Sequence, residues 1–435
     1  GTLVGFGATV AHHLDLGGGA PGLNPEARDV HQEGIIFPPS KYNMDHDWNG
    51  GPLERLVRAN IRVPDQTIGD FNAQFAANGI GGGRVMDLCA RFGADVVIEA
   101  MDELLDYSER RMRAAIRELP DGVYEGEDFL DDDGITDEPL RVQARVEIKG
   151  DSVIVDYEGT CDQVLTNVNC PYASTVAAGL SCVKAVLTSP DIPFNEGSKR
   201  AIEVRAPYGS LLNPRRPAPV RARMLSAYRA YNAVMKALAP SAPDKVIAAG
   251  FDSTEIIVLS QLKQDGYAIY LEIMGGGFGA SDHGDGCDAV DSPLSNCSNV
   301  PVEAMDMEYD YFRVEDYSLV QDSGGAGRYR GGLGFQRRYH ILGDGVTFAT
   351  YSDRFRLAPQ GLFGGADGVC ASTQVLRGDE VIQLASKTSF ALNKGDILVI
   401  RTGGGAGYGA RSERAPGDVE RDLREGFVSR AEAAE

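Results

Sequence analysis

The sequence predicts an α+β fold, large and mixed, with a helix-rich first half and a β-rich second half. Residues 70–118 are predicted to be mostly helical, and the i, i+3, i+4 spacing of an amphipathic helix is seen at Met101, Leu104, Leu105, Met112, Ile116 and Leu119. From residue 256 onward, short apolar runs are separated by glycine-rich turns, a pattern typical of sheets. Because helices and strands do not alternate along the chain, a doubly wound parallel sheet is not expected.

Local signals define the remaining elements. Residues 2–11, rich in Val, Leu, Phe and Thr, predict an N-terminal strand. The acidic run 125–133 lacks the spacing of a calcium-binding loop and predicts a solvated turn. Ser226 is a candidate N-cap for a helix that runs to Leu238. Two more helices are predicted at 53–62 and 173–187, a hairpin at 140–148 and 153–157, and strands at 256–261, 267–274, 334–342, 346–351, 373–376, 381–384 and 396–401.

These elements predict four regions along the 435 residues. The first is a candidate metal-site segment with a helical region, and an α+β middle region and a β-rich region follow it. A charged helical tail ends the chain. The expected boundaries are 1–130, 131–245, 246–418 and 419–435.

Composition excludes several classes of protein. The formal charge of −21 argues against nucleic acid and anionic membrane as partners. The seven cysteines are dispersed without a C-x-x-C pair, which indicates free thiols in a reducing compartment. No apolar run reaches the roughly 18 residues of a membrane span, and no signal peptide opens the chain. We therefore expect a cytoplasmic protein, and an upstream segment before Gly1.

The residues that point to chemistry lie near the N-terminus, where three of the six histidines fall within 31 residues. His12 and Asp15 are three residues apart, so a turn places both on one side. Imidazole and carboxylate are ligands of zinc, manganese and iron. The spacing therefore allows a metal site or an acid–base site, and equally a surface loop with solvated histidines.

Other polar clusters are weaker candidates. The glycine-rich loops 275–279 and 403–409 match neither a Walker loop nor a dinucleotide fingerprint, so they predict tight turns beside a packed interface. The loop 322–332 places Arg328 and Arg330 together, either as an anion site or as a structural arginine network. Asp282, His283 and Asp285 form a second possible polar site.

Motifs along the whole chain resemble the hydantoinase B family. The matching segments are AHHLDLGG (11–18), QEGIIFPP (32–39), NIRVP (60–64), GDFNAQ (69–74), DYEGT (156–160), NVPVE (299–303), DSGGAGRYRGG (322–332) and GGGAGYG (403–409). This family includes subunits of N-methylhydantoinase, acetone and acetophenone carboxylases and caprolactamase, and the C-terminal half of 5-oxoprolinase. Its members carry a further N-terminal segment that is absent here.

The resemblance implies a metal-binding subunit of an ATP-dependent hetero-oligomer. A hydantoinase A-type partner binds ATP, and this chain binds a divalent metal, Mn or Zn. His12 and Asp15 match a His-x-x-Asp metal pair in the acetone carboxylase member, and His31 is the candidate third ligand. Glu33 is expected as a nearby carboxylate that joins His12 and Asp15 in catalysis, whereas His13 is expected to point elsewhere.

The same resemblance leaves three functions open. The first is hydrolysis of a cyclic amide, such as a hydantoin, 5-oxoproline or a lactam, after ATP-dependent activation by the partner. The second is ATP-dependent carboxylation of a ketone with bicarbonate. The third is a non-catalytic scaffold role. In each enzymatic case the substrate is a small molecule.

Overall fold

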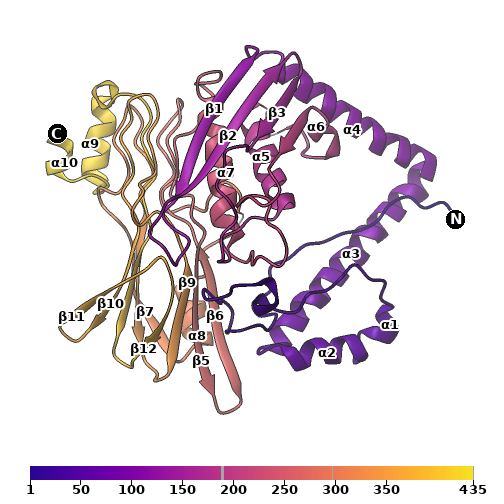
Figure 1. Cartoon of the computed structure of the whole chain (residues 1–435), viewed down its shortest axis with the longest axis horizontal. Helices are drawn as coiled ribbons and strands as arrows, with labels where there is room; N and C mark the ends of the chain where they lie inside the picture. Colours follow the sequence, from indigo (N-terminus) through magenta and orange to yellow (C-terminus); the bar gives the residue numbers. More distant parts are fainter. Residues whose placement is uncertain (188–190, 296, 435) are drawn as a thin grey trace.

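The computed structural model describes residues 1–187, 191–295 and 297–434, and it confirms the α+β class (Figure 1). Helices dominate the first half and strands the second. The helices are α1 (Met44–Asp47), α2 (Pro52–Asn60), α3 (Pro64–Phe92), α4 (Ala94–Ile116), α5 (Tyr172–Leu187), α6 (Glu196–Lys199), α7 (Arg223–Leu238), α8 (Val302–Glu308), α9 (Pro416–Glu425) and α10 (Arg430–Ala434), with 3-10 helices at Val30–Glu33 and Arg411–Glu413. Residue 435 of the predicted tail lies outside the described residues.

The strands form three sheets, mostly antiparallel. They are β1 (Gly122–Leu130), β2 (Leu140–Lys149), β3 (Ser152–Asp156), β4 (Ile202–Arg205), β5 (Glu255–Lys263), β6 (Gly266–Met274), β7 (Phe312–Leu319), β8 (Phe335–Ile341), β9 (Val346–Tyr351), β10 (Ser372–Arg377), β11 (Glu380–Leu384), β12 (Lys387–Leu392) and β13 (Ile397–Arg401). Their orders are β1-β2-β3-β4, β11-β10-β13-β8-β7 and β12-β9-β5-β6. The parallel pair β3 and β4 is joined through α5, a βαβ crossover that the sequence pattern did not predict.

The first sheet packs against α7 and, at β4, against α5, which also packs against α7. Strand β2 alternates inward and outward residues, so Val142, Ala144 and Val146 are buried while their neighbours face outward. A second core fills the space between the two sheets of the β-rich half, around Leu259, Phe348 and the aromatic rings of β6, β7 and β8. The strand signal in the sequence is strongest where one face of a strand is buried in this way.

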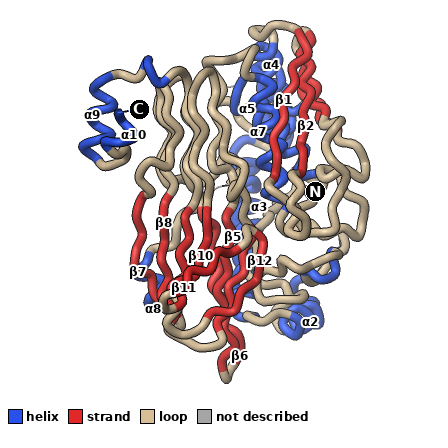
Figure 2. Tube along the Cα trace, turned by 60° about the vertical axis from the view of Figure 1, so that its left-hand side comes forward, coloured by secondary structure: helices blue, strands red, loops and turns tan. Residues whose placement is uncertain are grey.

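Glycine-rich loops are packed backbone to backbone above the two sheets of the β-rich half, as the bundled loops in Figure 2 show. Gly277 N–H donates to the carbonyl of Gly403 at 2.9 Å, and Gly405 N–H donates to that of Gly332 at 2.8 Å. A Cβ on Gly277 would lie 1.9 Å from the oxygen of Gly332. These loops therefore need glycine for close backbone packing, which confirms the tight interface predicted for them.

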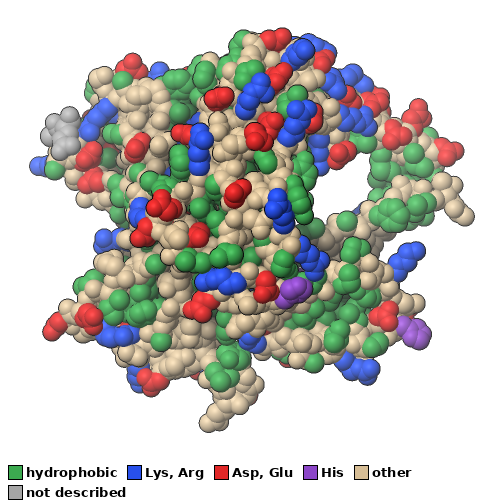
Figure 3. Space-filling model, viewed as in Figure 1, with side chains coloured by type: hydrophobic (Ala, Val, Ile, Leu, Met, Phe, Trp, Pro, Cys, Tyr) green, Lys and Arg blue, Asp and Glu red, His purple; other side chains and the backbone are tan. Residues whose placement is uncertain are grey.

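The long helices α3 and α4 meet at Gly93 and form an arm that stands away from the body of the molecule (Figure 1). An opening separates this arm from the body (Figure 3). In the predicted apolar stripe, Met112 and Ile116 are buried near the sheet, whereas Met101 and Leu104 are exposed farther along the arm. No helix in the described part of the chain is long and apolar enough to cross a bilayer.

Three local predictions are wrong. Residues 2–11 form no strand, and this extended segment instead runs beside α3, where Gly7 lies against Asn78. The acidic run belongs to β1 and pairs with β2 rather than forming a solvated turn. Helix α7 begins at Arg223, and Ser226 is buried inside it, donating to the carbonyl of Val168 instead of capping the helix. Three further strands, β4, β7 and β12, were not predicted.

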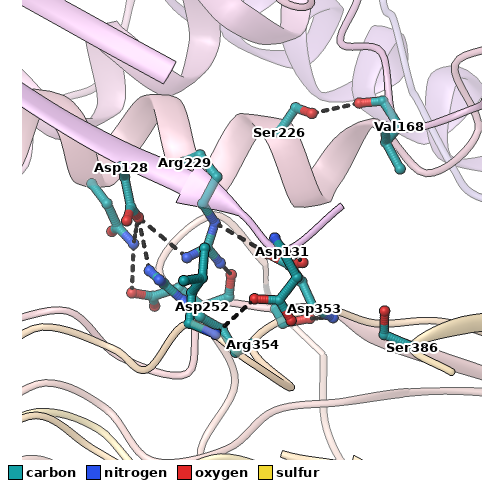
Figure 4. A network of polar contacts seen from close by, with 12 residues as sticks. Asp128, Asp131, Val168, Ser226, Arg229, Asp252, Asp353, Arg354 and Ser386 are labelled. Atoms are coloured by element: carbon teal, nitrogen blue, oxygen red, sulfur yellow. Dashed lines mark hydrogen bonds and ion pairs between the residues drawn. The ribbon is translucent and has the colours of Figure 1, made fainter. Parts of the chain in front are cut away.

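A buried ionic network joins the two halves of the chain (Figure 4). Asp128 of β1 accepts from Arg229 of α7 at 3.2 Å and from Arg354, which follows β9, at 2.8 Å. Lys236 lies 3.2 Å from its other oxygen. Burial alone raises the pKa of Asp128, but the charges of Arg354, Lys236 and Arg229 hold that pKa far below its usual value. The network thus fixes α7 against the β-rich half.

Candidate functional site

A cavity of about 640 Å³ lies where the N-terminal segment meets α3, the start of α7 and strands β5 and β6. Its polar lining includes His12, His13, Asp70, Arg221 and Arg223. Apolar side chains of β5 and β6, among them Ile256, Leu271 and Ile273, form another wall. This volume suits a small ring-sized ligand, since small-molecule sites range over roughly 300–1,000 Å³.

His12 is the predicted site residue that lines this cavity. Its Nε2 lies 2.8 Å from Nη2 of Arg223. Burial lowers the pKa of His12, and the charges of Arg223, Arg221 and His13 lower it further. The neutral ring therefore accepts a hydrogen bond from the Arg223 guanidinium.

His13, which the sequence placed outside the site, lines the same cavity on the α3 side. Its ring stacks on Phe71 with centroids 4.2 Å apart, and its side chain is 7% exposed. Its Nδ1 is buried without a hydrogen-bond partner, and the nearest carboxylate oxygen, from Asp70, is 4.0 Å away. The two adjacent histidines thus face different walls.

Asp15 lies beneath the N-terminal loop rather than in the cavity lining, and it is 1% exposed. One carboxylate oxygen accepts from the backbone N–H of Arg62 at 2.7 Å, and the other pairs with the Arg62 guanidinium at 3.0 Å. The backbone carbonyl of Asp15 also accepts from Thr67 of α3 at 3.2 Å. In this arrangement Asp15 anchors the histidine-bearing loop to α3.

Glu33 and His31 lie on one short 3-10 helix but have different surroundings. The Glu33 carboxylate accepts from the backbone N–H groups of Val220, at 3.0 Å, and Arg221, at 2.7 Å. Burial raises the pKa of Glu33, against the opposing effect of these two N–H groups. His31 is exposed, and only its backbone N–H is held, by Asp29. Glu33 therefore positions the segment that leads into α7.

As they lie, His12, Asp15 and His31 do not fit one divalent cation. The Arg62 guanidinium pairs with the carboxylate of Asp15, and the Arg223 guanidinium contacts the ring of His12. Within the described residues, no group of three or more His, Cys, Asp and Glu side chains is placed to hold a metal ion. The predicted Mn or Zn site stays a prediction.

The second candidate cluster is an arginine network. Arg328 pairs with Asp282, and Arg330 pairs with Asp288 at 3.0 Å. Asp285 accepts from Arg414 at 2.7 Å. Their carboxylates are therefore neutralised by arginine, which supports the structural interpretation of this loop over an anion site.

Sequence reasoning missed Arg221, Arg223, Asp70 and Thr254, all of which line the cavity. One signal could have revealed the arginines. They fall at the start of α7, whose first turn contains no acidic residue, although acidic residues are favoured at helix N-termini. Basic side chains at that position work against the helix dipole, so a role other than helix stabilisation was indicated.

Comparisons with known proteins agree on a family. The hydantoinase B/oxoprolinase profile matches residues 1–411. The B component of a putative D-/L-hydantoinase from a Pseudomonas strain is 36% identical over 447 residues, which cover 99% of this chain and 75% of that protein. The beta component of caprolactamase from Pseudomonas jessenii is 31% identical over 450 residues, which cover 99% of this chain and 76% of that protein.

Two solved structures share the fold. The crystal structure of ATP-dependent caprolactamase from Pseudomonas jessenii matches with a TM-score of 0.85 and 28% identity, over 96% of this chain and 74% of that one. A nucleotide-free acetone carboxylase structure matches with a TM-score of 0.84 over 98% of this chain and 63% of that one. At 17% identity, the second likeness shows the fold alone.

Proposed function

We propose, since this chain belongs to the hydantoinase B/oxoprolinase family, that it is the substrate-binding subunit of an ATP-dependent enzyme that opens a cyclic amide. The cavity beside His12 carries the proposal, because its volume and its mixed apolar and cationic lining suit a small polar ring. Relatives named as components of a hydantoinase and of a caprolactamase, each above 30% identity, favour ring opening.

The chemistry divides between two subunits. A partner of the A type transfers a phosphoryl group from ATP to the amide oxygen, which makes the ring carbon electrophilic. Water then adds to that carbon, the ring C–N bond breaks as the nitrogen takes up a proton, and a second water hydrolyses the resulting acyl phosphate to a carboxylate and phosphate. Residues of this chain hold the ring against β5 and β6 and restrict access of bulk water. The predicted metal would supply an activated water, but His12, Asp15 and His31 do not converge on one position, so no step is assigned to it.

A partner subunit is supported by the relatives and by the arm. Both relatives are named as single subunits, one the B component and the other the beta component. The arm exposes the apolar side chains of Ile80, Met86, Leu88 and Phe92, a feature typical of surfaces that another chain covers. We expect an obligate complex with an A-type ATPase. Size-exclusion chromatography checks this, and a stable monomer that hydrolyses ATP by itself would contradict it.

The activity test uses the complex of this chain with its A-type partner. ATP-dependent ring opening is measured with hydantoin, 5-oxoproline and ε-caprolactam, and a ketone is tested with and without bicarbonate. Ring opening that is lost in His12→Ala but kept in His46→Ala supports the proposal, because His46 is exposed on α1. Consumption of ketone only with bicarbonate would identify a carboxylase instead. No turnover of any substrate would favour a scaffold role.

The metal prediction has its own measurement, elemental analysis of the purified complex. Loss of bound Mn or Zn in the His12→Ala, Asp15→Ala double variant would show that these residues hold it. Metal content equal to that of the parent would reject the assignment. An Arg62→Gln variant is informative here, because it frees the Asp15 carboxylate without removing it.

A further inference from the structure

Two arginines line the cavity without a carboxylate partner. Within the described part of the chain, neither Arg221 nor Arg223 has a carboxylate oxygen within 4.0 Å of its guanidinium. Arg221 donates instead to the backbone carbonyl of Glu33 at 3.1 Å, and Arg223 contacts the neutral ring of His12. The buried arginines of this acidic chain pair with carboxylates: Arg229, Arg330, Arg337 and Arg354.

Two further features make this wall positive and able to donate hydrogen bonds. Arg223 and Met224 begin α7, so the positive end of a 16-residue helix faces the cavity, and its N-cap Ala222 provides no side-chain bond. Thr254 lines the cavity and is 2% exposed, and its Oγ1 lies near the Tyr228 hydroxyl but makes no hydrogen bond of good geometry. On the α3 side of the cavity, Nδ1 of His13 also has no hydrogen-bond partner among the described residues.

The remaining charges around the cavity leave this wall cationic. Among the described lining residues, Asp70 is the only carboxylate, and it lies beside His13 on α3 with half its side chain in solvent. The Glu33 carboxylate lies behind the wall, where it accepts from the backbone of Val220 and Arg221. Leu271 and Ile273 add an apolar surface to the same cavity.

We propose that Arg221, Arg223 and the first turn of α7 form an oxyanion-binding wall, so that the ligand of this cavity is a small ring bearing a carboxylate or phosphoryl group. The inference rests on the proposed function and adds which chemical group of the ligand this chain recognises. The ring lies against Leu271 and Ile273, and the oxyanion accepts from the two guanidiniums. The carboxylate would belong to the substrate itself, whereas a phosphoryl group would come from ATP.

A matched pair of ligands tests this directly. 5-Oxoproline and 2-pyrrolidinone share one five-membered lactam ring and differ only in the carboxylate. Binding to the full chain can be followed by the fluorescence of Trp48, its single tryptophan. The Trp48 ring lies 5.4 Å from Phe71, on which His13 stacks. Isothermal calorimetry provides a second readout of the same titration.

The expected result is a preference of at least about tenfold for 5-oxoproline, which Arg221→Gln and Arg223→Gln each reduce and the double variant abolishes. Arg216→Gln is the matched control, since Arg216 is exposed just before this segment. Inorganic phosphate then distinguishes the sources. Competition by phosphate at the same arginines identifies a phosphoryl site, and binding of 5-oxoproline without competition identifies a carboxylate site.

Three outcomes would overturn the inference: equal affinity for the two rings, a preference that survives in the double arginine variant, or no binding of either oxyanion by a folded chain. Circular dichroism of each variant establishes folding. These outcomes differ from failure of the proposed function. A complex that opens neutral lactams with ATP, yet shows no arginine-dependent anion binding, would keep the ring-opening function and reject the oxyanion wall.

Discussion

Arginines in two neighbouring regions of this chain have opposite surroundings. In the buried network, Arg229 and Arg354 both donate to Asp128, and that carboxylate is almost fully enclosed. In the cavity, the guanidiniums of Arg221 and Arg223 contact a carbonyl and an imidazole, and neither forms an ion pair with the described residues. Both regions include residues of α7 or of the turn before it. The difference indicates that the first pair stabilises the fold and the second is available to a ligand.

Breaking the buried network has the largest expected effect. Asp128→Asn removes the carboxylate that Arg229, Arg354 and Lys236 share, so the free energy of unfolding should fall by about 3–5 kcal/mol. Glu127→Gln is the control, because Glu127 pairs with Arg141 on the surface and should change stability by less than about 1 kcal/mol. Urea denaturation measures both, and equal effects would contradict a structural role for the network.

A second effect depends on pH. Burial raises the pKa of Glu255 from 4.5 to about 8, and bonds from Thr373 and Ser352 only partly oppose this. The unfolded carboxyl ionises near pH 4.5 while the folded one stays protonated, so this group lowers stability progressively between those pH values. Glu255→Gln removes the ionisation. Its free energy of unfolding, relative to that of the parent, should therefore increase by roughly 2–4 kcal/mol between pH 5 and 8. If the unfolding free energies of parent and variant stay parallel over this pH range, the raised pKa of Glu255 is contradicted.

Releasing the segment that carries the cavity arginines should have a smaller effect. Glu33→Gln weakens the bonds to the backbone of Val220 and Arg221, which should cost about 1–2 kcal/mol of stability. Because Arg221 also loses its fixed position, binding of 5-oxoproline should weaken too. Glu26→Gln is an exposed control nearby. Thermal denaturation and calorimetry together check the prediction, and weakened stability with unchanged binding would separate Glu33 from the cavity.

The smallest effect on stability is expected for the cavity arginines themselves. Arg223→Gln removes a guanidinium that has no carboxylate partner, so the free energy of unfolding should change by less than about 0.5 kcal/mol. The same variant should lose most of the preference for an anionic ring. A loss of stability comparable to that of Asp128→Asn would show that Arg223 is structural and would remove the contrast between the two regions.

The sequence predicted what depends on local pattern. Helices α2, α3, α4 and α5 and the strands of the second half other than β7 and β12 follow from apolar periodicity and glycine positions. The same approach failed at β1, because its acidic residues suggested solvent exposure. Asp128 is buried there only because arginines from α7 and from the loop after β9 converge on it, and no local pattern records that convergence.

The candidate site shows the same division. His12 was found because histidines are rare in this chain and one lies beside a glycine-rich turn. Arg221 and Arg223 are about 200 residues away along the chain, and only the fold brings them to the same cavity. Asp15 was singled out correctly as unusual, but its carboxylate pairs with Arg62 across 47 residues. Spacing identified the residues, whereas their partners required the structure.

The most direct test of this contrast is the shift in melting temperature that saturating 5-oxoproline or phosphate produces. A ligand that binds only the folded state stabilises it in proportion to the logarithm of its concentration over Kd. The melting temperatures of the parent protein and of Asp128→Asn should both rise by a few degrees with at least one of the two anions, although that of Asp128→Asn is lower without ligand. The Arg221→Gln, Arg223→Gln double variant should start near the parent and show no rise. A rise in the double variant equal to that of the parent would contradict the account.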